Sequence, residues 1–279
     1  MVCYTSTATW EEFANGSLTE ITITKQISLE MLPQNGCVHV TLHTGAAALS
    51  GLQDLPPLGQ FVERLAALYE ELVLQVTRNG EPVALLNHPH ILGKWQTLKE
   101  QLRDEQHEAD AVTEALLEQV EAQVQTPEQV LLSLRHDYMY RALLHVLGRP
   151  LFPASQVSPQ PVEFSQFFED SSLWFTEQME VIPTCVTHTT LAFRGVLHEQ
   201  ATDLRTVQQH IQAASHPTRS KAAQSSAAPG TASTALHGRY EAFYELEVAT
   251  RVPTAARLTV CCRLADRYNK QYSLNLQRV

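Results

Sequence analysis

The stretch EITITKQISLEMLPQNGCVHVTL, residues 20–42, decides the fold of this 279-residue chain. Apolar and polar residues alternate on both sides of the turn-forming tetrad Pro33-Gln34-Asn35-Gly36. The apolar positions are Ile21, Ile23, Ile27, Leu29, Val38, Val40 and Leu42, and Lys25 shares the register of the first four. A period of two is typical of strands with one buried face, and an Asn-Gly dipeptide favours a tight turn. The stretch therefore predicts an antiparallel hairpin.

Downstream of this hairpin the apolar spacing changes to three and four residues, which is typical of amphipathic helices. Such helices are predicted over residues 58–72, 87–102 and 112–124, and over 126–146, where Thr126-Pro127-Glu128-Gln129 has the spacing of a capping box. On the last helix, His136, Asp137, Tyr140 and His145 could form an acid/base set, but we favour an exposed polar stripe, because His136 and Tyr140 are four residues apart. A second hairpin, around Asn79-Gly80, interrupts the series.

Period-two patterning then returns in residues 162–164, 187–193, 240–248, 257–263 and 271–276. The predicted fold class is therefore α+β, with a curved antiparallel sheet built from N- and C-terminal strand blocks and covered by a central group of amphipathic helices. Two small sheets that share one helical layer fit the pattern as well. We expect a single domain over residues 1–279. Residues 213–235 hold mostly Ala, Ser, Thr, Gln, Pro and Gly, which predicts a flexible insertion.

Composition narrows the classes of function. The chain carries 20 Lys and Arg against 30 Asp and Glu, a formal net charge of −10, and its basic residues are scattered. This distribution argues against binding to nucleic acid or to an anionic membrane. Residues 1–7 do not resemble an export signal, and no run of 18 apolar residues occurs, so we expect no membrane span and a cytoplasmic location. The five cysteines are an odd number without C-x-x-C spacing, as fits a reducing compartment.

One cluster could bind a metal ion. Cys37, His39 and His43 share strand parity, so their side chains are expected on one face of a strand, and thiolate and imidazole groups are ligands for zinc or copper. The alternative is that they form the polar, solvent-facing side of an edge hairpin. The competing hypothesis for function, a metal-dependent protein or an unrecognised enzyme, depends on this Cys/His cluster.

Sequence signals for packing are abundant, whereas signals for catalysis are scarce. We find no Gly-x-Ser-x-Gly, no glycine-rich phosphate loop and no Gly-x-Gly-x-x-Gly, and we expect no cofactor and no catalytic residues. The leading hypothesis is a non-catalytic binding or accessory protein that holds a partner protein or an apolar ligand in a groove of the curved sheet and its helices. The candidate recognition residues belong to the densest aromatic stretch, whose alternative role is core packing: Phe164, Phe167, Phe168, Trp174 and Phe175.

Several segments together resemble a family of uncharacterised bacterial proteins of unknown function. They are residues 61–72, 72–80, Leu86-Asn87, 91–99 with Lys94-Trp95, 131–144 and Gly238-Arg239-Tyr240. This resemblance implies the same architecture and a bacterial origin, and it transfers no catalytic residue. Residues 238–276 also look like the strand meander of half-barrel carrier proteins that hold lipidated or hydrophobic cargo, an analogy of pattern.

Overall fold

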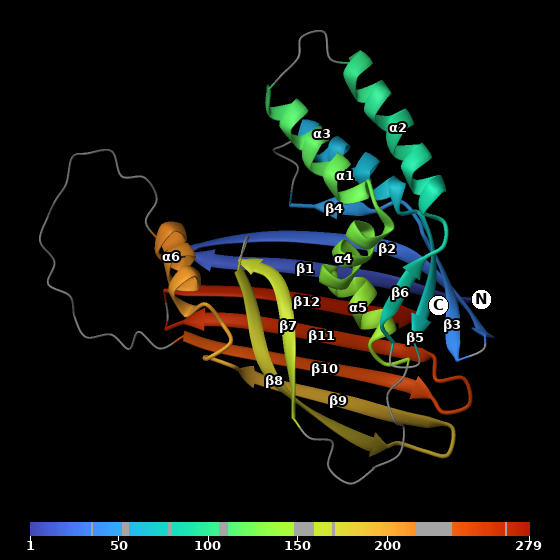
Figure 1. Cartoon of the computed structure of the whole chain (residues 1–279). Coiled ribbons are helices and arrows are strands. Elements are labelled where there is room, and N and C mark those ends of the chain that lie inside the picture. Colours follow the sequence, from blue (N-terminus) through green and yellow to red (C-terminus); the bar gives the residue numbers. More distant parts are fainter. Residues whose placement is uncertain are drawn as a thin grey trace, which may run out of the picture.

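The computed structural model describes residues 1–34, 36–51, 56–77, 80–105, 111–147, 159–168, 171–215, 236–265 and 267–279. Within these ranges the chain forms one antiparallel sheet of twelve strands, ordered β6-β5-β3-β2-β1-β12-β11-β10-β9-β8-β7, with β4 paired to β2 (Figure 1). The strands are β1 Val2–Ala14, β2 Ser17–Gln34, β3 Cys37–Thr44, β4 Ala48–Ser50, β5 Glu71–Thr77, β6 Pro82–Leu85, β7 Gln160–Phe168, β8 Ser171–Pro183, β9 His188–Leu197, β10 Leu236–Glu247, β11 Pro253–Leu264 and β12 Tyr268–Arg278.

The N- and C-terminal strand blocks join where β1 pairs with β12. The paired stretch runs from Tyr4 opposite Arg278 to Ala14 opposite Tyr268. This pairing confirms the prediction that both strand blocks belong to one curved sheet and not to two small sheets. Strand β1 itself was not predicted, although Asn15 and Gly16 both have positive φ, 54° and 77°, as a type I′ turn between β1 and β2 requires.

Six helices are described: α1 Pro56–Leu68, α2 His88–Glu105, α3 Ala111–Val124, α4 Pro127–His136, α5 Tyr138–Leu144 and α6 Leu204–Ser215. The single helix predicted over 126–146 is wrong. It divides into α4 and α5 at Asp137, whose ψ of 117° is extended and whose side chain caps α5. Helix α6 was not predicted, and it includes residues 213–215 of the predicted insertion; residues 216–235 lie outside the described residues. No described helix is long and apolar enough to cross a membrane.

Helices α4 and α5 lie between the two end strands of the curled sheet (Figure 1). Arg135 of α4 donates to the carbonyl of Pro82 in β6 at 3.1 Å. On the other side, Arg141 of α5 donates to the carbonyl of Glu163 in β7, and its guanidinium lies 4.5 Å from the Phe164 ring centroid. Backbone groups on both end strands are therefore paired by this helix pair, which also fills much of the concave side.

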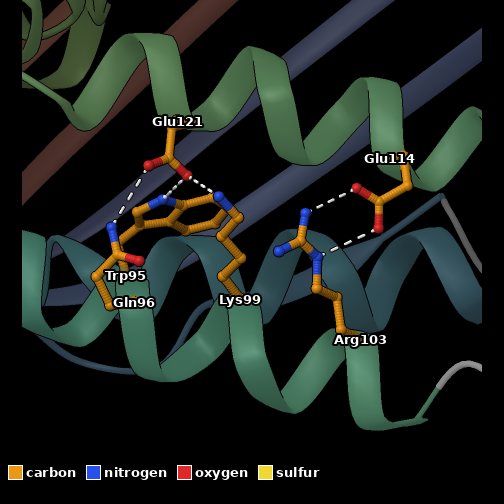
Figure 2. Close-up of polar contacts among 6 residues, drawn as sticks. All are labelled: Trp95, Gln96, Lys99, Arg103, Glu114 and Glu121. Carbon is orange, nitrogen blue, oxygen red and sulfur yellow. Dashed lines mark hydrogen bonds and ion pairs between the residues drawn. The ribbon is translucent and has the colours of Figure 1, made fainter.

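Helices α1, α2 and α3 differ from the prediction because they form a second core of their own, beside the sheet, around Trp95, Leu98 and Leu117. Figure 2 shows how polar side chains hold α2 to α3. The Trp95 indole N–H donates to Glu121 at 2.9 Å, Lys99 forms an ion pair with the same carboxylate, and Arg103 pairs with Glu114 at 2.9 Å. The sequence predicted that all central helices cover the sheet. In the structure, α4 and α5 are the helices that mainly cover its concave face (Figure 1).

Candidate functional site

A cavity of about 200 Å³ lies on the concave side of the sheet, at the break between α4 and α5. Its floor is formed by β1, β2 and β12, the strands at which the two strand blocks meet, and β7 contributes one wall. The lining residues are Ser6, Ala8, Trp10, Ile23, Lys25, His136, Asp137, Tyr138, Met139, Ser165, Gln166 and Tyr272. We call this space the concave cavity.

Three aromatic rings line the concave cavity and pack against one another. Trp10 and Tyr272 are direct cross-strand neighbours on β1 and β12, and their ring centroids lie 4.7 Å apart. Tyr138, the first residue of α5, packs against both, at 5.7 Å from Trp10 and 4.8 Å from Tyr272. Tyr138 and Tyr272 are buried, whereas Trp10 is half-buried. This floor suits a flat apolar group.

The part of β7 that lines the cavity contains a β-bulge. The pairing of β7 with β8 shifts register between Phe164 and Phe168, and Gln166 inside this bulge has φ of 55°, in the left-handed region. The bulge presents Ser165 and Gln166 to the cavity. A bulge re-aims side chains, and a non-glycine residue with positive φ is found more often at functional sites than elsewhere.

Asp137 and Lys25 bring opposite charges to the concave cavity. One carboxylate oxygen of Asp137 accepts hydrogen bonds from the backbone N–H of Met139, at 2.8 Å, and of Tyr140, at 3.2 Å, while the side chain keeps contact with solvent. Surrounding protein raises the pKa of the Asp137 carboxyl above its usual value, and the Lys25 ammonium and the two backbone donors oppose that shift. The two side chains therefore act on each other within the cavity, from β2 and from the helix break.

Two hydroxyl groups in the cavity lack a protein partner. Ser6 is 2% exposed and Tyr272 is 4% exposed, and within the described part of the chain neither hydroxyl has a hydrogen bond. Ser6 lies directly opposite Lys25 in the β1–β2 pair. Burial and the nearby Asp137 carboxylate raise the pKa of the Tyr272 hydroxyl far above its usual value, so Tyr272 is a hydrogen-bond donor at neutral pH. Because both residues line the cavity and neither hydroxyl is used within the described protein, both hydroxyls are candidates for hydrogen bonds to a ligand.

The aromatic residues predicted for recognition lie mostly in the core. Phe164, Phe167, Phe168 and Phe175 are at most 2% exposed, while Trp174 is half-buried and alternates with buried neighbours, so it points to the other face of β8. Phe167 lies 5.6 Å from Trp10, and Phe164 lies 5.4 Å from Tyr138, measured between ring centroids. Two of the five, Phe164 and Phe167, therefore pack against rings that line the concave cavity.

The predicted metal ligands Cys37, His39 and His43 lie along β3, on the side opposite the buried Val40 and Leu42. Strand β3 is not at the edge of the sheet, because β2 and β5 flank it. His43 lines a surface depression with Glu70 and Glu71. Among the residues that the structure describes, no three Cys, His, Asp or Glu side chains are grouped closely enough to hold a metal ion.

A second concavity separates α1 from α2. Ala67, Leu68 and Leu98 give it an apolar base, and Arg64 and Lys94 stand at its rim. Both cations are already paired, Arg64 with Glu105 at 2.7 Å and Lys94 with Glu70 at 3.2 Å. We call it the α1–α2 groove.

Sequence reasoning missed most residues of the concave cavity. Trp10 belongs to the unpredicted strand β1, and Asp137 was assigned to a polar stripe on an unbroken helix. Lys25 gave a usable signal, because it interrupts an otherwise apolar strand face. A charged residue at such a position predicts either a paired buried ion or a polar site.

No protein-family model matches the chain, and no curated protein matches it. A solved structure described as "Lipid-protein interactions in lipovitellin" is similar in fold, with a TM-score of 0.49 and 9% sequence identity. The match covers 100% of this chain and 25% of that chain, so the present chain spans about a quarter of the length of that protein. A likeness of this size does not bear on function.

Proposed function

We propose that this protein is a non-catalytic binding protein that holds a small apolar molecule in the concave cavity. The observation that carries the proposal is the floor formed by Trp10, Tyr138 and Tyr272, set in a recess that also presents two unpartnered hydroxyls. Ligand sites are typically concave, mostly apolar and furnished with a few polar groups that orient the ligand. The wider hypothesis from the sequence, that the chain holds a partner protein, stays a prediction.

The size of the cavity limits the ligand. An apolar cavity of ~150 Å³ is large enough to bind benzene, whereas sites for drug-sized molecules occupy roughly 300–1,000 Å³. At about 200 Å³, the concave cavity matches a single ring or a short alkyl chain. A longer molecule would fit only if its remainder lay outside, along the concave face.

Fluorine NMR with fluorobenzene as an apolar probe tests the proposal. Ala8 lines the cavity from β1, so Ala8→Leu fills part of the space, whereas Thr7→Leu adds a similar group on the other face of the same strand. We expect the wild type and Thr7→Leu to broaden or shift the probe signal, and Ala8→Leu to lose the effect. Absence of any effect with the wild type, or an unchanged effect with Ala8→Leu, would overturn the proposal.

A further inference from the structure

We propose that the concave cavity selects ligands whose polar head is uncharged, of the alcohol or carboxamide class. This inference rests on the proposed function and concerns the end of the ligand that reaches Lys25, Asp137, Ser6 and Tyr272. It follows from two properties of those four groups: the balance of their charges and the kinds of hydrogen bond that they can form.

The first property is electrical neutrality. Lys25 and Asp137 carry opposite formal charges, and each offsets the other in the lining. A ligand with a carboxylate would add a second negative charge to the lining beside Asp137, and a cationic ligand would add a second positive charge beside Lys25. Either complex would unbalance the charge of a recess that is partly walled by protein, where charges are screened less than on an open surface.

The second property is the mixture of donors and acceptors. The Lys25 ammonium and the Tyr272 hydroxyl donate, the Ser6 hydroxyl can donate or accept, and the Asp137 carboxylate accepts. Asp137 already receives two backbone N–H groups on one oxygen, which leaves its second oxygen for another donor. A hydroxyl or a carboxamide offers both an acceptor and a donor, so it can satisfy both sides without adding charge.

The strand registers place Lys25 and Ser6 at one end of the aromatic floor. Lys25 and Ser6 are cross-strand partners on β2 and β1, while Trp10 and Tyr272 are cross-strand partners on β1 and β12, four residues further along β1. Four residues span roughly 13 Å of strand, and Ala8 lies between the two pairs on the same face of β1. A single-ring ligand seated over Ala8, beside Trp10, would therefore direct its substituent along β1 toward Ser6 and Lys25.

Three probes of nearly equal shape test the inference at pH 8: benzamide, which is neutral, benzoate, which is an anion, and benzamidine, which is a cation. Calorimetric titration of the wild type should give at least tenfold tighter binding of benzamide than of either charged probe. Lys25→Met should shift the preference toward benzamidine by about tenfold or more, and Asp137→Asn should shift it toward benzoate by a similar factor. Lys94→Met, which removes a lysine of the α1–α2 groove, should leave the preference unchanged.

The outcomes separate the two proposals. If the wild type binds benzoate or benzamidine as tightly as benzamide, the inference about the head group is wrong while the binding function stands. The same holds if fluorobenzene binds and all three polar probes fail. If fluorobenzene has no effect on the wild type, the proposed function itself is overturned, whichever of the three probes bind. Circular dichroism of each variant verifies that it is folded.

Discussion

The hydroxyl of Tyr138 donates a 2.7 Å hydrogen bond to the backbone carbonyl of Ser165. Because Tyr138 begins α5 and Ser165 lies in the bulge of β7, this contact ties the helix pair to an end strand of the sheet. Both residues also line the concave cavity. One side chain therefore helps to close the sheet edge and to shape the proposed binding site.

Tyr138→Phe should destabilise the fold by about 1–2 kcal/mol, because it removes a buried hydrogen bond and leaves a buried carbonyl unpaired. Chemical denaturation measures the loss. Tyr4→Phe is a matched control, since the Tyr4 hydroxyl donates a comparable buried bond to the carbonyl of Pro253 at 2.9 Å. We expect a similar loss of stability in both variants and weaker fluorobenzene binding in Tyr138→Phe alone. Equal weakening of binding in both variants would show that the Tyr138 contact has no special role in the cavity.

Asp137→Ala should cost about 1 kcal/mol of stability, because Asp137 caps the N-terminus of α5. Asparagine caps helices about as well as aspartate, so Asp137→Asn should stay within a few tenths of a kcal/mol of the wild type. Urea denaturation of both variants measures the difference. If Asp137→Asn is as unstable as Asp137→Ala, the carboxylate contributes through its charge and not through capping.

The link between α2 and α3 should depend on pH. Hydrogen bonds from Lys99 and from Trp95 lower the pKa of the Glu121 carboxyl below its usual value of 4.5. A carboxyl with a lowered pKa in the folded state contributes stability that is present above its unfolded pKa and is lost as the pH falls through its folded pKa.

Glu121→Gln should therefore lower the free energy of unfolding at pH 7 by about 1 kcal/mol, a modest figure because the pair is partly exposed to solvent. The gap between variant and wild type should narrow as the pH falls below the usual carboxyl range. Glu118→Gln, which changes an exposed carboxylate on the same helix, should have little effect. A gap that stays constant from pH 7 to acid would contradict this account of the Glu121 cluster.

Cys185 should be the most reactive cysteine near neutral pH. It lies exposed in the turn between β8 and β9, with its sulfur 3.3 Å from the Thr187 hydroxyl and 3.8 Å from His188 Nδ1. These hydrogen bonds, that from Thr187 above all, lower the pKa of the thiol to about 6. By contrast, burial raises the pKa of the Cys262 thiol to about 12.

The rate of iodoacetamide labelling at Cys185, followed by peptide mass spectrometry, should rise with a midpoint near pH 6. Thr187→Val should move that midpoint toward the ordinary thiol value, whereas Thr184→Val in the same turn should not. Cys262 should remain unlabelled in the folded protein. A wild-type midpoint above pH 8 would mean that the turn does not stabilise the thiolate.

Much of the architecture was predictable because it depends on local periodicity. The alternation around Ile21 and Val40 and the three-to-four spacing of Ile91, Trp95, Leu98 and Leu102 correspond to strands β2 and β3 and to the buried face of α2. The Thr126 cap was also read correctly, because its side chain accepts from the backbone N–H of Gln129. Local patterns of this kind fix the type of an element and leave its partners open.

What could not be predicted depends on contacts between distant residues. Strand β1 is partly exposed on both faces. Thr5, Thr7 and Thr9 lie on one face and Ala8 and Trp10 on the other, so polar and apolar residues alternate only weakly along the strand. The helix break at Asp137 interrupts an apolar stripe that continues on both sides. The cavity unites β1, β2, β12, β7 and the α4–α5 break, and no local pattern indicates that these segments meet.

The measurement that tests the central claim most directly is amide and indole chemical-shift mapping of the nitrogen-15-labelled protein during titration with fluorobenzene. The account predicts that the largest shifts occur at the indole N–H of Trp10, at the backbone N–H of Tyr138 and Met139, and at β1 and β12 around Ala8 and Tyr272. Shifts confined to the α1–α2 groove around Leu68 and Leu98, or shifts nowhere at all, would contradict the claim that the concave cavity binds the ligand.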